Sequence, residues 1–259
     1  MNKTIRNIII FYVGTLLLAI GGGLVMASGQ DAGGLLFILS PLVMVLIVRF
    51  VLGDGWKDAG LSLNLKESWG WYLFALLLYP IIFLITIIIN MVLGFTTLTM
   101  TVGELLPALL TGFAIQLLPR MFFALSEEFA WRGYLEPRFT TMGMPDLQRH
   151  LVIGVLWGIW HFPLIFSTDY TNVSYLIFLP MFMISVLLLA IIYGQIRKSS
   201  RSVWPEVLMH GMANAVGFAI LEGNLIAYNN EWLGSIATGG LTITVIYGLV
   251  ALIIWARKK

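Results

Sequence analysis

Apolar residues fill the chain in runs of about 20 residues, and short polar segments separate these runs. A helix needs about 20 mostly apolar residues to cross a membrane. The pattern therefore predicts an all-α polytopic membrane protein with one transmembrane domain over residues 1–259. Residues 25–27 could end a signal peptide, but the apolar run before them is longer than a signal core, so we expect this span to be retained. About eight spans are expected, at 7–27, 35–52, 71–94, 105–125, 151–167, 175–196, 204–221 and 236–256.

The composition narrows the classes of function. Hydrophobic residues make up 59% of the chain and charged residues 11%, whereas a soluble globular protein is about 25% charged. These proportions argue against a soluble enzyme and against intrinsic disorder. The net charge is +2 and no basic cluster is large enough to hold a phosphate backbone, so we expect no nucleic-acid partner. The chain has no cysteine, which leaves oxygen and imidazole groups for chemistry.

The charged residues divide the predicted loops into two sides. The loops of one side contain neither Lys nor Arg, and their acidic residues are Asp31, Glu104, Asp169, Glu222 and Glu231. Nearly all Lys and Arg residues fall on the other side, and Arg120 alone lies inside a span. Cytoplasmic loops carry the excess of positive charge. We therefore expect a multi-pass protein of the plasma (inner) membrane, with both termini in the cytoplasm and the lipid bilayer as a partner.

A first polar cluster lies at the cytoplasmic end of the fourth predicted span. Glu128 and Arg132 are four residues apart and share a helix face, so we expect an ion pair between them. Glu127 is rotated from Glu128 by about 100° and is free to point elsewhere, on a stripe that also holds Arg120. Ionisable groups inside a span favour a functional site. The alternative is a hydrated charge cluster that caps the helix end.

Two further clusters contain histidine. Trp157 lies one turn before His161 and can pack on its imidazole, whereas His210 and Asn214 share one helix face, with Glu206 a turn away. The alternatives are a buried histidine with its hydrogen bonds satisfied and polar packing between helices. All three clusters lie toward the cytoplasmic ends of their spans. A cytoplasm-facing cavity could join them, and it would hold the groups that hydrolysis needs.

The three clusters together resemble the motif set of the CPBP family, which reads EExxxR, FxxxH and HxxxN. This family includes the Ras-converting CAAX prenyl endopeptidases and the bacterial Abi-type intramembrane proteases. Trp157 stands where the family has Phe, which keeps an aromatic ring before the histidine. The resemblance covers about 120–218 and suggests a catalytic core at about 105–221, whereas the first three spans agree only in topology.

The resemblance implies an intramembrane endopeptidase that hydrolyses membrane-associated peptides or proteins. In that family Glu127 would activate water and His161 would help to hold it. His210 and Asn214 would stabilise the tetrahedral oxyanion. Glu128 and Arg132 would shape the site, with Trp157 and Arg120 in supporting positions.

The residues leave the cofactor and two other functions open. Glu127, His161 and His210 could supply three ligands to one divalent metal ion such as zinc, as in a metalloprotease. The chain lacks the His-Glu-x-x-His helix of common zinc proteases, which favours a metal-independent glutamate mechanism with no cofactor. A non-catalytic scaffold or bacteriocin-immunity protein is one alternative. A proton-coupled transporter is the other, although we find no inverted repeat.

Overall fold

The computed structural model describes residues 2–257, and these form a bundle of helices with one two-stranded sheet. The first half of the bundle consists of α1 (Lys3–Ala27), α2 (Ala32–Leu46), η1 (Ile47–Val51), α3 (Leu65–Val92), β1 (Thr96–Leu98), α4 (Val102–Ala130), η2 (Trp131–Leu135) and α5 (Glu136–Thr141). The second half consists of α6 (Asp146–Trp160), α7 (Phe162–Ser167), α8 (Tyr175–Ser200), α9 (Trp204–Glu222), β2 (Ile226–Tyr228), α10 (Glu231–Gly234) and α11 (Leu241–Ala256). The all-α membrane fold is confirmed.

Helices lie at every position where the sequence predicts a span, but they differ in length and polarity. Six segments of the described chain are long and apolar enough to cross a membrane: Lys3–Ala27, Ala32–Val51, Leu65–Val92, Val102–Thr141, Asp146–Ser167 and Tyr175–Ser200. The helix α11 has only 16 residues, because its N-terminal part is a loop. The helix α9 is more polar, since it carries Glu206, His210 and Asn214. Of the eight expected spans, six therefore lie in segments of sufficient length and apolarity, and those at α9 and α11 do not.

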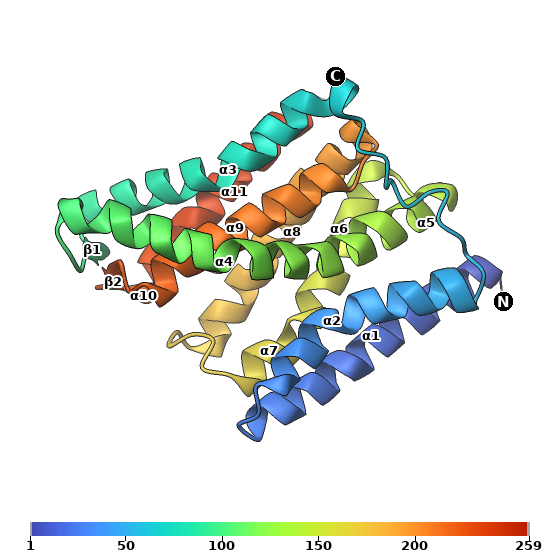
Figure 1. Ribbon diagram of the computed structural model, residues 1–259, viewed down its shortest axis with the longest axis horizontal. Helices are drawn as coiled ribbons and strands as arrows, with labels where there is room; N and C mark the ends of the chain where they lie inside the picture. Colours follow the sequence, from blue (N-terminus) through green and yellow to red (C-terminus); the bar gives the residue numbers. More distant parts are fainter. Residues whose placement is uncertain (1, 258–259) are drawn as a thin grey trace.

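The helices α4 and α9 cross the centre of the bundle side by side (Figure 1). The pair α1 and α2 lies at one edge next to α7, and α3 and α11 lie at the opposite edge. Small residues allow the helices to approach closely. A Cβ atom on Gly211 of α9 would lie 2.0 Å from the sulfur of Met121 in α4. This close contact brings the polar residues of α4 and α9 together.

Local sequence fixes the starts of α4 and α9. A capping box begins α4, in which the backbone N–H of Thr101 donates to the Glu104 carboxylate at 3.0 Å. Pro205 occupies the first turn of α9, where its missing N–H leaves no helical bond unmade. Because both helices start at defined residues, the faces that carry Glu127 and His210 are fixed as well.

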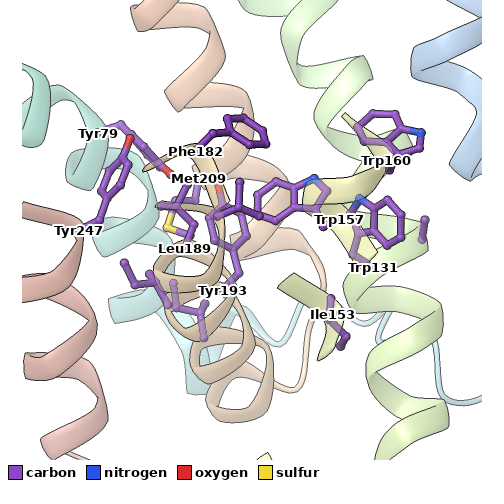
Figure 2. Packing of buried hydrophobic residues seen from close by; sticks show 14 of the residues in the cluster. Tyr79, Trp131, Ile153, Trp157, Trp160, Phe182, Leu189, Tyr193, Met209 and Tyr247 are labelled. Atoms are coloured by element: carbon purple, nitrogen blue, oxygen red, sulfur yellow. Dashed lines mark hydrogen bonds between the residues drawn. The ribbon is translucent and has the colours of Figure 1, made fainter. Parts of the chain in front are cut away.

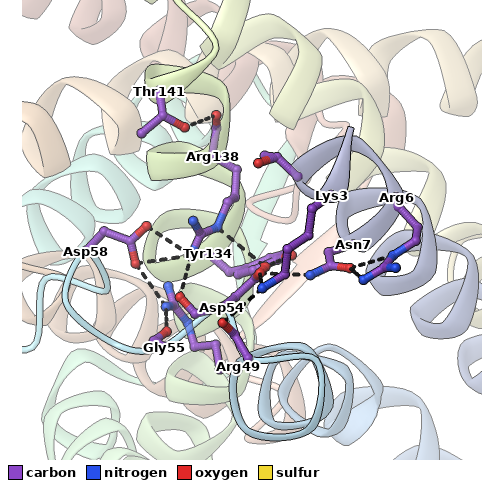
Figure 3. A network of polar contacts seen from close by, with 12 residues as sticks. Lys3, Arg6, Asn7, Arg49, Asp54, Gly55, Asp58, Tyr134, Arg138 and Thr141 are labelled. Carbon is purple, nitrogen blue, oxygen red and sulfur yellow. Dashed lines mark hydrogen bonds and ion pairs between the residues drawn. The ribbon is translucent and has the colours of Figure 1, made fainter. Parts of the chain in front are cut away.

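A network of ion pairs ties the loops together at the basic end of the bundle (Figure 3). Asp58 pairs with Arg49 at 2.9 Å and with Arg138 at 3.0 Å. Asp54 accepts hydrogen bonds from the hydroxyl of Tyr134 at 2.9 Å and from the amide of Asn7 at 2.8 Å. The network therefore links α1, η1, η2 and α5. The antiparallel pair β1 and β2 lies at the other end, which we call the acidic end after its loops.

Candidate active site

Glu127 and Glu128 end α4 inside the bundle, and both side chains are buried. An Nη1 atom of Arg132 lies 3.1 Å from Oε2 of Glu128, which is the ion pair that their spacing predicts. Arg132 itself belongs to the π-helical turn η2, directly after α4. Such turns are frequent at functional sites, because the extra residue redirects the side chains that follow. The turn holds the guanidinium beneath the site, over the rings of Trp157 and Tyr193 at 4.5 Å each.

His210 lies between the two carboxylates. Its Nδ1 atom is 2.7 Å from Oε1 of Glu128, and its Nε2 atom is 3.7 Å from Oε1 of Glu127. A carboxylate that accepts from Nδ1 fixes both the orientation and the tautomer of an imidazole. The Glu128–Arg132 pair therefore orients His210, and the second ring nitrogen faces Glu127.

Trp157 of α6 contacts Glu127 directly. Its indole N–H donates to Oε2 of Glu127 at 2.8 Å. The expected packing of Trp157 near His161 is also present, with 5.8 Å between the ring centroids. This hydrogen bond could not be predicted from the sequence, because a pattern within one helix does not show what lies opposite it. A phenylalanine, which the family motif has here, could not donate it.

His161 lies at the junction of α6 and α7. Its Nδ1 atom is 2.9 Å from the carbonyl oxygen of Trp157, one turn earlier. A carbonyl oxygen can only accept, so Nδ1 carries the hydrogen and Nε2 keeps a lone pair. The ring packs against Phe182 and lines the same cavity as His210. His161 can therefore accept a hydrogen bond from a molecule in that cavity.

A cavity of about 410 Å³ joins these side chains. Trp157, His161, His210 and Asn214 all line it, and the side-chain amide of Asn214 makes no hydrogen bond within the described chain. Figure 2 shows the aromatic wall around Trp157, to which α3, α8 and α11 contribute the labelled side chains Tyr79, Phe182, Tyr193 and Tyr247.

The cavity extends in an unexpected direction. Its lining continues to Tyr170, Leu221 and Ala237, which lie toward the acidic end. On the side of the basic loops, the buried Arg132 and Glu206 fill the space below His210. Desolvation in the wall raises the pKa of the partly buried Tyr170 to about 12, so it remains a neutral hydroxyl. The expected cavity toward the basic end is therefore replaced by one toward the acidic end, because buried charged side chains close the basic side.

Arg120 lies apart from the other predicted site residues. Its guanidinium pairs with Glu222 at 3.0 Å and donates from Nε to Gln116 at 2.9 Å. It also lies 3.4 Å from the centroid of the Phe218 ring. The stripe that joins Arg120 to Glu127 is correct for one helix, but the length of the arginine carries its charge away from Glu127.

Glu206 is the buried acid to which the sequence assigned no role. It is 0% exposed, and neither carboxylate oxygen has a hydrogen-bond partner within residues 2–257. Arg197, Glu128 and Arg132 surround it closely enough to act on its charge. The signal that could have singled it out is its place on the stripe of His210 and Asn214, since a charge at that depth is costly.

The metal site that the sequence left open does not fit this geometry. Within residues 2–257, no three His, Asp or Glu side chains lie in positions that could hold a metal ion together. Nδ1 of His210 is occupied by Glu128, and one oxygen of Glu127 is occupied by Trp157. His161 and His210 therefore line one cavity, and Glu127 lies next to His210, but the three do not form a ligand set.

Comparison with known proteins finds a matching family model. Residues 111–216 match a family model described as type II CAAX prenyl endopeptidase Rce1-like. This family model corresponds to the CPBP/CAAX protease family that the motifs resemble. The matched segment contains all three motifs of the resemblance and runs from α4 into α9. No curated protein matches the chain. At the level of the CPBP/CAAX family, the match supports an intramembrane CAAX-type endopeptidase.

Proposed function

We propose that the protein is an intramembrane endopeptidase in which Glu127 is the general base. The observation that carries this proposal is the position of Glu127. One of its oxygens is held by Trp157 at 2.8 Å and the other faces His210 at 3.7 Å, and both Trp157 and His210 line the cavity. A base held by one donor and left free at its second oxygen can take a proton from a bound water molecule.

The reaction is a hydrolysis in which every proton has a place. Glu127 takes one proton from water while the water oxygen attacks the peptide carbonyl. Nε2 of His161 accepts a hydrogen bond from the other O–H of that water and so holds it in position. The oxyanion accepts hydrogen bonds from the Asn214 amide and from Nε2–H of His210. This requires a hydrogen on both ring nitrogens of His210, and Glu128 stabilises that imidazolium form by accepting from Nδ1–H, as a carboxylate does in a catalytic triad. Glu127 then gives its proton to the leaving nitrogen, and the C–N bond breaks.

The lining of the cavity indicates the chemical class of the substrate. Aromatic and aliphatic side chains form most of the wall, and the polar groups gather around His161, His210 and Asn214. A site of this kind takes an apolar segment and orients it with a few polar contacts. We therefore propose membrane-associated peptides or proteins as substrates. From the distribution of Lys and Arg we also propose a plasma (inner) membrane location, with the basic end and both termini in the cytoplasm.

The test compares new protein N-termini in membranes from cells that contain wild type or Glu127→Gln. The matched control is Glu67→Gln, which makes the same chemical change at an exposed position at the start of α3. All three proteins are adjusted to equal abundance. We expect a set of termini that wild type and Glu67→Gln share and Glu127→Gln lacks.

An identical set of termini in all three membranes would refute the endopeptidase. That result would favour the alternative function, a non-catalytic scaffold or immunity protein. A proton or ion flux in liposomes that depends on Glu127 would instead indicate a transporter.

A further inference from the structure

The charge of Arg120 has no part in the chemistry proposed above. Arg120 lies about 27 Å along α4 from Val102 and about 10 Å before Glu127, at 1.5 Å per residue. A cation at this depth is costly unless it serves a function. Its surroundings therefore indicate what it can bind.

The guanidinium of Arg120 lies at the edge of the cavity. Phe218 lines the cavity, and the guanidinium carbon is 3.4 Å from the centroid of its ring. Glu222 places a carboxylate oxygen 3.0 Å from Nη2, and the amide of Gln116 donates to the second oxygen of the same carboxylate. The position is thus already shaped for a carboxylate, and Glu222 occupies it.

The pair of Arg120 and Glu222 differs from the buried ion pairs of the bundle. The side chains of Arg132 and Glu128 are 1% and 0% exposed, whereas those of Arg120 and Glu222 are 18% and 52% exposed. Glu222 is also the last residue of α9, where its side chain can turn away without disturbing the helix. Exposed ion pairs contribute little to stability, so another carboxylate can replace Glu222.

We propose that Arg120 binds a carboxylate of the substrate peptide in place of Glu222 and so favours acidic peptides. Arginine suits this role, because its planar fork forms two parallel hydrogen bonds with a carboxylate. The depth of Arg120 favours a peptide over a lipid headgroup, since a headgroup phosphate stays at the membrane surface. The proposal rests on the endopeptidase function, in which the bound peptide reaches Glu127 about 10 Å away.

The test measures peptide binding to the Glu127→Gln protein in neutral detergent micelles, so that no turnover occurs. Three forms of one short apolar peptide are compared: the C-terminal acid, the C-terminal amide, and the amide with one internal glutamate. We expect either carboxylate to tighten binding over the plain amide by roughly tenfold. Adding Arg120→Gln should remove that difference, whereas adding Glu222→Gln should increase it, because the competing carboxylate is gone.

The opposite directions distinguish a binding role from a structural one. Both substitutions break the same ion pair, so a purely structural pair would change binding in the same direction in both variants. A change in the same direction in both variants would overturn the proposal. So would equal binding of the acid and the amide, or binding of none of the peptides. Competition by phosphatidylglycerol in place of the peptide acid would assign Arg120 to headgroups and would overturn it too.

The binding test and the comparison of N-termini can each refute one proposal without refuting the other. Binding to the Glu127→Gln protein needs no hydrolysis. Carboxylate-dependent binding without Glu127-dependent termini would refute the endopeptidase and keep the carboxylate site. Glu127-dependent termini without a preference for the acid would refute only the role of Arg120.

Discussion

The basic end of the bundle and the site beneath α9 both bury charged side chains, but they partner them differently. Asp54 accepts hydrogen bonds and ion pairs from several groups, among them Tyr134 and Arg138. Glu206, one turn from His210, accepts none within the described residues. In the same part of the chain, Arg132 at the site and Arg49 and Arg138 at the basic end each keep one buried nitrogen without a hydrogen-bond partner, so the difference lies in the carboxylates. A carboxylate with several donors fixes a loop in place, whereas one with none can be satisfied by water or a ligand. The difference distinguishes the network that stabilises the fold from the candidate active site.

The largest effect should follow from removing Arg132, the cation that pairs with Glu128 at the site. Arg132→Met leaves Glu128 as a buried charge without its ion-pair partner, so we expect the free energy of unfolding to fall by about 3–5 kcal/mol. Unfolding in mixed micelles measures this change. Arg257→Met, at an exposed position, is the matched control. Equal stability of both variants would show that the site does not depend on this pair.

Loss of one carboxylate at the basic end should destabilise the protein less and leave chemistry unchanged. Asp54→Asn removes the charge that Tyr134, Arg138 and Asn7 share, and we expect a loss of about 1–3 kcal/mol in the free energy of unfolding. Cleavage of a substrate found by the N-terminal comparison should keep its wild-type rate. A loss of cleavage at full stability would erase the distinction between the two regions.

The hydrogen bond from Trp157 to Glu127 should affect the rate more than the stability. We expect Trp157→Phe, which keeps the ring and loses the N–H, to lower the cleavage rate by roughly tenfold. Trp157→Ala should lower it further, because His161 also loses its packing, and the protein should still fold. Trp160→Phe is the control, since Trp160 donates to Ser40 and not to Glu127. Full activity of Trp157→Phe would remove this account of the second motif.

The smallest change is expected at Glu206. Its carboxylate accepts no hydrogen bond within the described chain, so Glu206→Gln should shift the free energy of unfolding by less than about 1 kcal/mol, in either direction. Glu128→Gln, measured beside it, should destabilise the protein by more. A loss at Glu206 as large as that at Glu128 would mean that Glu206 is as firmly paired as Asp54.

Sequence reasoning worked where spacing along one helix decides the geometry. The four-residue spacings predict the Glu128–Arg132 ion pair and the shared face of His210 and Asn214. In the structure His210 and Asn214 line one cavity, and the ion pair contacts His210 through Glu128. The resemblance to the CPBP family rests on the same spacings. The predicted helices are present for the same reason, since apolar runs set their positions.

What the sequence could not provide depends on contacts between helices. Three features involve side chains far apart in the chain: the hydrogen bond from Trp157 to Glu127, the ion pair of Arg120 and the direction of the cavity. Spacing within a helix gives the face of a residue but not what lies opposite that face. The burial of Glu206 follows from the close approach of α4 and α9, which small residues permit and no local pattern reveals.

The turn η2 connects the two regions within five residues. Arg132 points to the site, the carbonyl of Gly133 accepts a hydrogen bond from Arg49, and Tyr134 reaches Asp54. Deleting a single codon here would restore an α-helical turn and rotate everything after it by about 100°. The length of this turn therefore sets the positions of the site and of the loop network at the same time.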